Sequence, residues 1–533
     1  MKKIFFLLLL VILLCVSCGK KTDTSPEINE GEEAHVCRFV EKVAKPKYIK
    51  TRASCTQRSE FYYSCSCGAM GTESFAYGEM SGHDYYIKKA EQIYLVKEAT
   101  VKTSAVYYKS CTCGAVGVDT FEYGKPIELD EATRPYLPAS LTVTLYDTEL
   151  YTYGFTYNTY ASPREPVIQI KRPTDSEWTE YIPTSYETST LDPDDNTVPL
   201  YISKAEITLL PNTEYVYRVG DKGLQLYTPE ASLKTKSSST DSFTFAHLSD
   251  SQAGPDEFGR VMAAVSGSSD FVVHTGDVVQ YARYEYEWFE MLDGNYEQLM
   301  GMPIMAITGN HETSYSGATY GIANHFNNAM PEQSSTALGY YYSFVYGGVK
   351  FIMLNTGDLV DHRLKDEQYN WLINELESNT ARWTVVAMHE PMYSVGKYGA
   401  DETRNANSLG LRDQLQGVFA EYGVDLVLQG HDHAISRTYP IDAGGAVGSE
   451  TIELIDGVEY IVDPDGVIYL MNGPAGTQQR APYEVDETLY AYATSSKKAS
   501  YAEITVTEDT LTVTVKWLDG ANERVYYTWG IKK

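Results

Sequence analysis

The second half of the chain contains five short apolar runs, and each run ends in residues that bind metals well. The runs and their polar ends are residues 243–249 before Asp250, 271–275 before Asp277, 304–308 before Asn310, 383–388 before His389, and 424–429 before His431 and His433. Short continuous apolar runs are typical of buried strands. The carboxyl ends of such strands lie along one edge of an α/β sheet, where these folds build their sites. We therefore expect residues between Asp250 and His433 to converge on one crevice.

The stretch before these runs shows a different pattern, in which apolar and polar residues alternate. Alternation over residues 140–145 and 214–219 predicts half-buried strands. Turn-forming clusters such as residues 191–196 separate the strands at the spacing of a β-sandwich. Residues 135–236 are therefore expected to form an all-β spacer or platform, and a polar linker joins it to a last domain over residues 241–533.

The N-terminal region repeats itself with a period of 46 residues. Residues 64–69 match residues 110–115, and the Tyr-Gly pair at residues 77–78 matches the pair at 123–124 without a gap. Such self-similarity indicates two copies of one small structural unit. We expect residues 35–125 to form two tandem β-rich repeats.

Six of the eight cysteines lie in these repeats. The first copy offers Cys37, Cys55, Cys65 and Cys67, whereas the second offers His83, Cys111 and Cys113 and has Val101 where Cys55 would map. Zinc prefers four thiolate or imidazole ligands in a tetrahedron, so the cysteines indicate a structural Zn²⁺ site that is complete in the first copy and incomplete in the second. Disulfides in an oxidising compartment are the alternative interpretation. The repeats resemble the short zinc-ribbon-like repeats found in tandem on some bacterial surface proteins.

The N-terminus has the features of an export signal. Two lysines precede an apolar stretch over residues 4–14, and small residues follow it. A cysteine at the expected cleavage point resembles a bacterial lipobox, which would make Cys18 the lipidated first residue of the mature chain. The resemblance implies a signal over residues 1–18, a polar tether over residues 19–34, and an exported lipoprotein of a bacterial cell envelope or a secreted protein.

The charge balance excludes some function classes. The chain of 533 residues contains 43 Lys and Arg against 72 Asp and Glu, which gives a formal net charge of −29. Nucleic-acid binding depends on neutralising phosphates with basic residues, so we expect no nucleic-acid partner. The same balance disfavours adhesion to anionic lipids, so we expect membrane contact only through the lipid anchor. No feature of the sequence indicates a protein partner.

The residues at the strand ends form a ligand set of mixed chemistry. They provide two carboxylates, one amide oxygen and three imidazoles, a combination that suits two divalent or trivalent ions. One carboxylate can bridge both ions and hold them about 3.5–4 Å apart, which is the arrangement used for in-line displacement at phosphorus. The pattern therefore predicts a dinuclear metal centre that acts on phosphate esters.

The ordered motifs resemble those of the calcineurin-like metallophosphoesterases and, among them, the purple acid phosphatases. The motifs are Asp250-Ser251-Gln252, Gly276-Asp277-Val278-Val279-Gln280-Tyr281, Gly309-Asn310-His311-Glu312, Val386-Ala387-Met388-His389 and Gly430-His431-Asp432-His433. The resemblance implies an α/β (α+β) four-layer sandwich, with two β-sheets flanked by helices, preceded by a fibronectin type III-like domain. It also implies the metal ligands, which are Asp250, Tyr281 and His433 for the first ion, Asn310, His389 and His431 for the second, and Asp277 as the bridge.

Tyr281 distinguishes the purple acid phosphatases within this resemblance. General metallophosphoesterases carry a His two positions after the first Asp, where this chain has Gln252. Because a tyrosinate suits Fe³⁺, the first ion is expected to be Fe³⁺ and the second Fe²⁺, Zn²⁺ or Mn²⁺.

The implied activity is that of a metal-dependent phosphoric ester hydrolase. A metal-bound hydroxide would attack phosphorus in line, and His311 would protonate the leaving alkoxide as a general acid. We expect an acid-phosphatase-like phosphomonoesterase that acts outside the cytoplasm on phosphorylated small molecules. Two alternatives remain open, namely a phosphodiesterase or nucleotidase on the same site, and a surface binding protein that keeps the fold only as a scaffold.

Overall fold

The computed structural model describes residues 35–97, 99, 104–237, 242–313, 320–331, 340–400, 405–483, 485–520 and 522–533. The predicted signal with Cys18, the predicted tether and Val101 lie outside the described residues. The chain divides into two compact units. We call residues 1–98 and 105–124 the repeat unit, and residues 99–104 and 125–533 the large unit. No helix among the described residues is both long and apolar enough to span a lipid bilayer.

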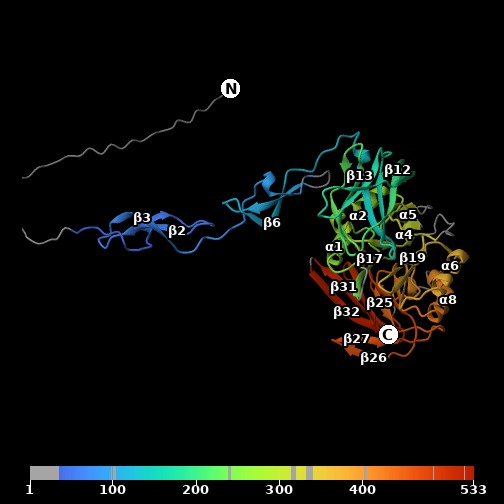
Figure 1. The fold of residues 1–533 in the computed structure, drawn as a ribbon. Coiled ribbons are helices and arrows are strands. Elements are labelled where there is room, and N and C mark those ends of the chain that lie inside the picture. Colours follow the sequence, from blue (N-terminus) through green and yellow to red (C-terminus); the bar gives the residue numbers. More distant parts are fainter. Residues whose placement is uncertain are drawn as a thin grey trace, which may run out of the picture. The chain divides into compact units, whose positions relative to one another are not determined.

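The repeat unit contains two copies of one three-stranded antiparallel sheet (Figure 1). The first copy has η1 (Pro46–Tyr48), β1 (Ile49–Thr51), β2 (Ser59–Ser64) and β3 (Met70–Tyr77), and the second has η2 (Gln92–Tyr94), β4 (Leu95–Lys97), β5 (Ala105–Ser110) and β6 (Val116–Tyr123). Their strand registers correspond, because Phe61 pairs with Phe75 in one copy and Tyr107 with Phe121 in the other. Each copy is too short to build a large core, and the buried cluster of the first contains only Tyr48 and the two phenylalanines.

The large unit begins with two antiparallel sheets after η3 (Arg134–Tyr136). One sheet has the order β11 (Thr184–Leu191), β12 (Thr197–Thr208), β8 (Thr152–Thr159), β7 (Ala139–Asp147), and the other contains β10 (Thr179–Tyr181), β9 (Pro166–Lys171), β13 (Glu214–Asp221), β14 (Leu226–Tyr227) and β15 (Ala231–Lys234). Phe155 and Tyr217 meet between the sheets with ring centroids 5.3 Å apart. The Tyr217 hydroxyl donates to the carbonyl of Met300 at 2.7 Å, so this sandwich packs directly on the rest of the large unit.

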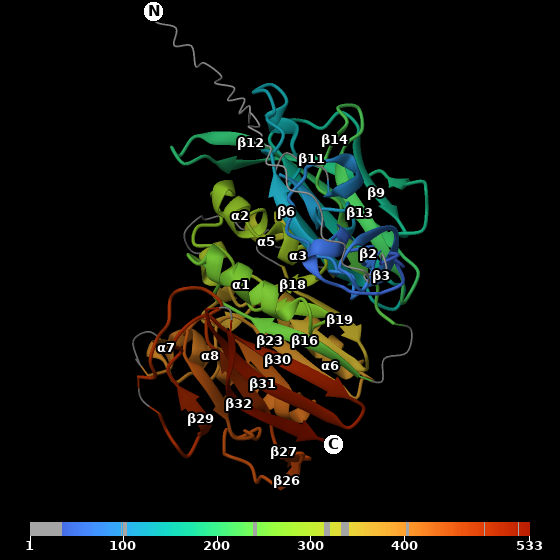
Figure 2. The same cartoon turned by 90° about the vertical axis from the view of Figure 1, so that its left-hand side faces the viewer.

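Two stacked mixed sheets form the remainder of the large unit. The first has the order β18 (Ile304–Ala306), β17 (Phe271–His274), β16 (Ser242–Leu248), β30 (Ser500–Thr507), β31 (Thr510–Asp519), β32 (Asn522–Lys532), β27 (Val458–Val462), β26 (Ile452–Ile455). The second has the order β19 (Tyr342–Tyr346), β20 (Val349–Met353), β23 (Trp383–Met388), β24 (Leu426–Gln429), β28 (Ile468–Asn472), β25 (Ile435–Thr438), β29 (Tyr490–Thr494). Figure 2 shows β16, β30, β31 and β32 side by side, as their pairing requires.

Helices flank both sheets and the neighbouring sandwich. They are α1 (Pro255–Val265), α2 (Glu285–Leu292), α3 (Tyr296–Leu299), α4 (Asn310–Thr313), α5 (Tyr320–His325), α6 (Asp366–Glu377), α7 (Lys397–Ala400) and α8 (Ala406–Glu421), and a small hairpin pairs β21 (Leu359–Val360) with β22 (Arg363–Leu364). The rings of Phe245 and Phe351 meet between the sheets with centroids 5.0 Å apart. The ring of Phe258 in α1 packs against His274 outside the first sheet, with centroids 6.1 Å apart. Val427, between two inward residues of β24, packs with α6 and α8. The four layers confirm the predicted fold class.

The five apolar runs that end in metal-binding residues are β16, β17, β18, β23 and β24. They do not share one sheet, because the first three are parallel neighbours in the first sheet and the last two are parallel neighbours in the second. The expected crevice therefore lies where the carboxyl edges of two stacked sheets meet. The stacking of the two sheets places the ligands together, and the pattern of apolar residues along the chain does not reveal that stacking.

Candidate metal centre

The loops that follow these strands hold their ligands in an uncommon backbone conformation. Asp250, Asp277, His431 and His433 all have positive φ angles, of 53°, 56°, 72° and 53°. Such angles are rare for residues other than glycine and cost about 1–3 kcal/mol each, so they persist only where the surrounding structure imposes them. The tight turns aim each side chain back over the end of its own strand, toward the space between the sheets.

One group of ligands surrounds the amide oxygen of Asn310. The Nε2 atom of His389 lies 3.0 Å from this oxygen and the Nδ1 atom of His431 lies 2.7 Å from it. His389 also lies 3.3 Å from Oδ2 of Asp277, and donor atoms of Asp277, His389 and His431 all fall within 4.8 Å of one another. Nitrogen and oxygen donors that converge in this way fit a metal ion of borderline hardness.

A second group lies on the other side of Asp277. The Nε2 atom of His433 is 3.2 Å from the carboxylate of Asp250, and both residues are buried. The side-chain amide of Gln252 connects the groups, because its nitrogen lies 3.3 Å from Asp277 and 3.4 Å from His433. Asp277 therefore contacts His389 directly and reaches the second group through Gln252, and its role as the bridge stays a prediction. The donor chemistry on both sides fits a metal ion.

The electrostatics of the pocket favour positive charge. Burial alone would lower the pKa of His389, but the carboxylates of Asp277 and Asp250 raise it to about 10. Burial likewise acts to raise the pKa of Asp250, yet the nearby imidazoles of His433 and His389 hold it far below its usual range. Two ionised carboxylates in a buried pocket require a cation, and bound metal ions can replace the protons that otherwise supply it.

Glu312 is a functional residue to which the sequence assigned no role. It is fully buried, and its carboxylate accepts hydrogen bonds from the backbone N–H groups of Gly309 at 2.8 Å, Asp277 at 2.9 Å and Val278 at 2.9 Å. Burial, followed by the charge of Asp277, raises the pKa of Glu312 to about 7. The carboxylate thus ties the loop after β17 to the loop after β18. Its position inside the Gly309–Glu312 motif was the only available signal.

His311 lies beside the two groups without belonging to either. Its backbone N–H donates to Oδ1 of Asp277 at 2.8 Å, and its Nε2 atom is 3.9 Å from Oδ2 of the same residue. The Nδ1 atom lies 2.8 Å from the carbonyl oxygen of Gln280, which can only accept a hydrogen bond. The Nδ1 atom also lies 3.2 Å from the side-chain amide nitrogen of Gln280, so Nδ1 is engaged with Gln280 and Nε2 is the ring nitrogen nearest the carboxylate of Asp277. The general-acid role stays a prediction.

Tyr281 occupies a different environment from the other predicted ligands. Its side chain is 37% exposed, and its ring lies edge-on to Tyr284 with centroids 6.2 Å apart. The residue lies in the loop before α2 and not in the first turn of that helix, and its backbone N–H donates to Glu287 at 2.7 Å. Gln252 is the side chain that contacts His433 and Asp277. The Fe³⁺-ligand role of Tyr281 stays a prediction.

The segment at residues 394–398 forms one wall beside His431. The ring of Tyr398 packs on the His431 ring with centroids 4.1 Å apart, and the backbone N–H of Tyr398 donates to the buried carboxylate of Asp432 at 3.1 Å. Asp432 also accepts a hydrogen bond from the Ser394 hydroxyl. The middle residue of the Gly430–His433 motif therefore points away from the ligands and holds this wall in place.

The cysteines of the repeat unit are grouped differently from the prediction. The structure places His35 with Cys37, Cys65 and Cys67, and it places Cys55 with His83, Cys111 and Cys113. Cys55 lies in the β1–β2 loop, where the carbonyl of Ser54 accepts a hydrogen bond from the backbone of Ser81 at 2.9 Å. This contact turns Cys55 toward the second copy. The predicted first set was therefore wrong in Cys55, and the second copy is not short of a ligand.

The fold and the arrangement of the candidate ligands can be compared with those of known proteins. The family model described as calcineurin-like phosphoesterase matches residues 243–434. An uncharacterized protein of Mycobacterium tuberculosis is 31% identical over 36% of this chain and 39% of its own length. Purple acid phosphatase 15 of Arabidopsis thaliana is 28% identical over 34% of this chain and 31% of its own length. The chain thus spans less than half the length of these two relatives.

The likeness also holds for a solved structure. A purple acid phosphatase from yellow lupin (Lupinus luteus) seeds superposes on 81% of this chain and 80% of its own with a TM-score of 0.62. The sequences are 16% identical over that match, so the likeness concerns the fold. The recognition of a purple-acid-phosphatase-like metallophosphoesterase from the ordered motifs is confirmed.

Proposed function

We propose that the protein is a dinuclear-metal phosphoesterase that hydrolyses phosphate monoesters outside the cytoplasm. The position of Asp277 carries the proposal, because its carboxylate touches the His389 side and the Gln252–His433 side of one buried pocket. A pocket used only as a scaffold has no physical need for buried carboxylates and imidazoles that converge on two ligand groups. The names of the relatives support the same reaction class.

The residues of the pocket have separate tasks in this reaction. Asp250, His433 and Asp277 would hold one ion, and Asn310, His389 and His431 would hold the other with Asp277 shared. Two ions bound there supply the charge that activates water and neutralises the transition state. His311 would bind a proton at Nε2 and deliver it to the leaving oxygen, while its Nδ1 stays hydrogen-bonded to Gln280.

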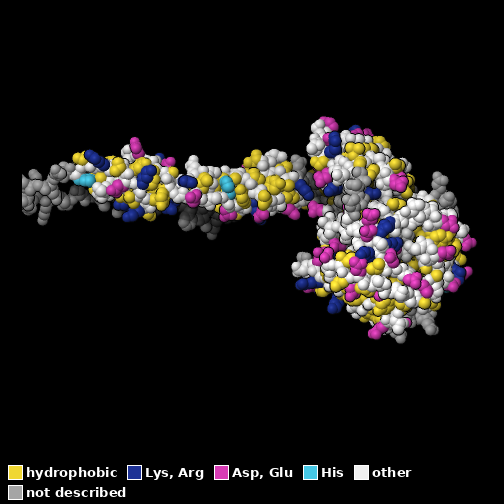
Figure 3. Space-filling view, turned by 60° about the horizontal axis from the view of Figure 1, so that its bottom comes forward, with side chains coloured by type: hydrophobic (Ala, Val, Ile, Leu, Met, Phe, Trp, Pro, Cys, Tyr) yellow, Lys and Arg dark blue, Asp and Glu magenta, His cyan; other side chains and the backbone are white. Residues whose placement is uncertain are grey.

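The surface charge makes the ions responsible for attracting the substrate. Asp and Glu side chains are scattered over the face of the large unit drawn in Figure 3, with Lys and Arg interspersed among them. A chain of net charge −29 repels a phosphate ester at long range, so attraction must arise locally in the pocket. We propose Fe³⁺ in the first position, with Tyr281 as a ligand, and Fe²⁺, Zn²⁺ or Mn²⁺ in the second.

The first experiment tests the bridge. The Asp277→Asn variant should lose metal and reduce kcat/KM for an aryl phosphate monoester by at least about 1000-fold, because two ions lose one anionic ligand. Asp456→Asn is the matched control, since Asp456 is an exposed aspartate that also has a positive φ angle. Full metal content and full turnover in the Asp277→Asn variant would refute the proposal. A panel of monoesters, diesters and nucleotides on the wild-type protein decides between phosphomonoesterase and phosphodiesterase.

The cellular location is a separate proposal that depends on the N-terminal sequence. We propose an exported lipoprotein anchored through Cys18. A Cys18→Ser variant should no longer incorporate radiolabelled palmitate and should leave the membrane fraction, while the wild type does both. Unchanged labelling in that variant would show that Cys18 is not the lipidated residue.

A further inference from the structure

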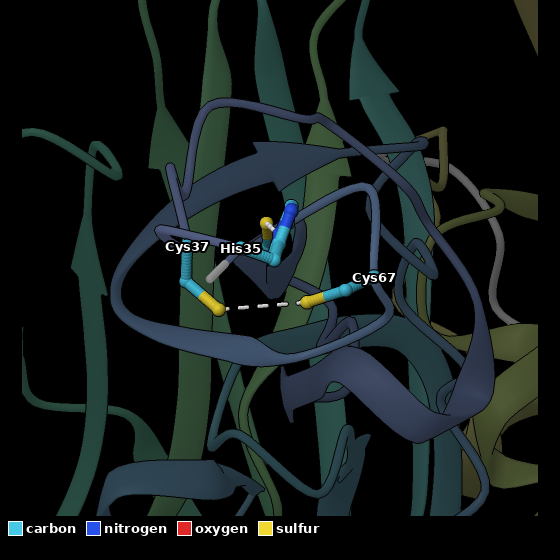
Figure 4. Close-up of side chains that lie close together, drawn as sticks. His35, Cys37 and Cys67 are labelled. Atoms are coloured by element: carbon cyan, nitrogen blue, oxygen red, sulfur yellow. Dashed lines mark hydrogen bonds between the residues drawn. The ribbon is translucent and has the colours of Figure 1, made fainter. Parts of the chain in front are cut away.

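The repeat unit contains two clusters of metal-binding side chains that the phosphoesterase reaction does not use. Each cluster consists of one imidazole and three thiols whose donor atoms lie within 4.8 Å of one another. They are His35, Cys37, Cys65 and Cys67 in the first cluster and Cys55, His83, Cys111 and Cys113 in the second. Figure 4 shows part of the first cluster, in which the thiols of Cys37 and Cys67 point toward each other beside His35. Together the clusters include every cysteine among the described residues.

Three of four donor–donor distances in the two clusters are those of ligands around one ion, and the fourth is shorter. Four thiolate or imidazole ligands about 2.0–2.3 Å from a tetrahedral Zn²⁺ lie roughly 3.3–3.8 Å from one another. In the first cluster, the sulfur atoms of Cys37 and Cys67 are 3.5 Å apart, and His35 Nε2 is 2.9 Å from Cys65 Sγ. In the second, Cys55 and Cys111 are 3.8 Å apart, and the separation of His83 Nδ1 from Cys113 Sγ is 3.4 Å.

The composition of the clusters disfavours disulfides. Each cluster has three thiols, so one disulfide within it would leave one thiol and one imidazole without a role. All six thiols could pair only if a bond crossed from one cluster to the other. Three thiolates and one imidazole are instead a complete ligand set for structural zinc, and soft thiolates select against Ca²⁺ and Mg²⁺.

The backbone around the paired cysteines is shaped in the same way in both copies. The N–H of Gly68 donates to the carbonyl of Cys65 at 2.8 Å, and the N–H of Gly114 donates to that of Cys111 at 2.9 Å. Both glycines have a positive φ angle, of 86° and 90°, which glycine adopts without strain. The resulting turn presents the two cysteines of each Cys-x-Cys pair to one point. Outer hydrogen bonds of this kind orient metal ligands.

The fourth ligand is supplied from different places in the two copies. In the first copy it is His35, two residues before Cys37, and the position equivalent to His35 in the second copy is Ser81. The backbone N–H of Ser81 donates to the carbonyl of Ser54, which brings Cys55 of the first copy to the second cluster. The second cluster is thus completed by the preceding repeat.

We propose that each cluster binds one structural Zn²⁺ and that the second ion joins the two repeats through Cys55. The first ion stabilises a single copy, whose buried cluster of three aromatic residues is small for an independent fold. The second ion holds the β1–β2 loop of the first copy against the second copy and so sets how one repeat follows the next. A longer array of such repeats could extend by the same contact.

Cobalt substitution tests the two sites separately from the phosphoesterase centre. The large unit contains no cysteine, since the last one is Cys113, so thiolate-to-Co²⁺ absorption reports on the repeats alone. The full-length mature protein should bind two equivalents of Co²⁺ with this absorption, and Zn²⁺ should displace both. A disulfide-linked pair of cysteine peptides in the native protein, together with no thiolate-to-Co²⁺ band, would overturn the proposal.

Paired Cys→Ser variants test which cluster Cys55 belongs to. Cys55→Ser with Cys111→Ser should remove one equivalent of Co²⁺, because both residues serve the second site. Cys55→Ser with Cys65→Ser should remove two equivalents, and Thr112→Ser is the control that should remove none. If the first pair removed two equivalents and the second pair only one, Cys55 would belong to the first site and the link between repeats would be refuted.

Limited proteolysis tests the proposed connection of the two repeats through Cys55 without measuring metal stoichiometry. Arg52 and Arg58 flank Cys55 in the β1–β2 loop and provide trypsin sites. In the Zn²⁺-loaded full-length protein, Cys111→Ser should speed cleavage at these arginines severalfold, although residue 111 is in the other repeat. Cleavage at the wild-type rate in Cys111→Ser, with faster cleavage in Cys37→Ser, would contradict a link through Cys55.

Discussion

The two regions that gather metal ligands differ in what holds those ligands in place. In the large unit, Asp250 and His389 are buried at the edge where the two stacked sheets meet, and their turns are held by a core that spans both sheets. In the repeat unit, Cys37 and Cys113 are exposed, and the buried cluster of the first copy contains three aromatic residues. In the large unit the core fixes the ligand positions, whereas in the repeat unit the proposed metal ions would stabilise the fold.

This difference indicates that the free energy of metal binding can serve catalysis in one unit and folding in the other. When a large core already fixes strained turns, the ligand geometry exists before the ion arrives, and the ion is available for chemistry. When the core is small, ordering the ligands costs conformational entropy that the ion must offset, so binding and folding are coupled. A metal ion could therefore serve catalysis in the large unit and act as a structural crosslink in the repeat unit.

Metal removal should separate the two units most strongly. Dialysis of the full-length protein against a chelator should lower phosphoesterase activity by at least about 1000-fold, since both ions are lost. Hydrogen exchange should increase in β2 and β5 of the repeat unit but stay slow in β16 and β24 of the large unit. Peptide-resolved mass spectrometry measures both effects. Rapid exchange in β16 and β24 would show that the large unit also depends on metal for its fold.

Loss of the Glu312 carboxylate should have the next largest effect. Glu312→Ala leaves several buried N–H groups without an acceptor, which should destabilise the large unit by about 3 kcal/mol. Because these groups position the Asp277 loop, activity should fall about 10–100-fold, with a smaller loss in Glu312→Gln. Calorimetry and kcat/KM at saturating metal measure the two losses. Glu290→Ala, at an exposed position on α2, is the control, and equal behaviour of both alanine variants would contradict the role of Glu312.

Tyr281→Phe should have an intermediate effect. If Tyr281 ligates Fe³⁺, the wild-type protein should absorb visible light through a phenolate-to-iron transition, and the variant should lose the band and about tenfold in activity. Tyr284→Phe is the matched control, because the two rings are neighbours. A colourless wild-type protein that contains two metals other than iron, with normal activity in Tyr281→Phe, would exclude the iron–tyrosinate assignment.

Deletion of the repeats should have the smallest effect on catalysis. A chain lacking residues 35–125 should keep its kcat/KM for an aryl phosphate within about twofold, because sites that share no partners act additively. The predicted ligands and His311 all lie at or after Asp250 in the large unit. A near-complete loss of activity in a folded, metal-loaded deletion variant would show that the repeats contribute to the site.

The sequence by itself determined the elements of the centre and their chemistry. The apolar runs at residues 271–274 and 426–429 became strands because short continuous hydrophobic segments must be buried on both faces. Ligand types at the ends of those strands could be read because their spacing is local. The motifs therefore predicted Asp277 and His389 as ligands from the sequence alone, with His311 directly after the predicted ligand Asn310.

Only the tertiary structure decided how these elements combine. Whether β17 and β23 lie in one sheet or two depends on which faces pack together, and no local spacing records it. Glu312 acquired its role because a loop more than 30 residues earlier in the chain presents N–H groups to it. Cys55 joined the second repeat for the same reason, since the Ser54–Ser81 contact brings it there. Local periodicity encodes secondary structure, whereas partners distant in the chain are chosen by burial and hydrogen bonding in the folded state.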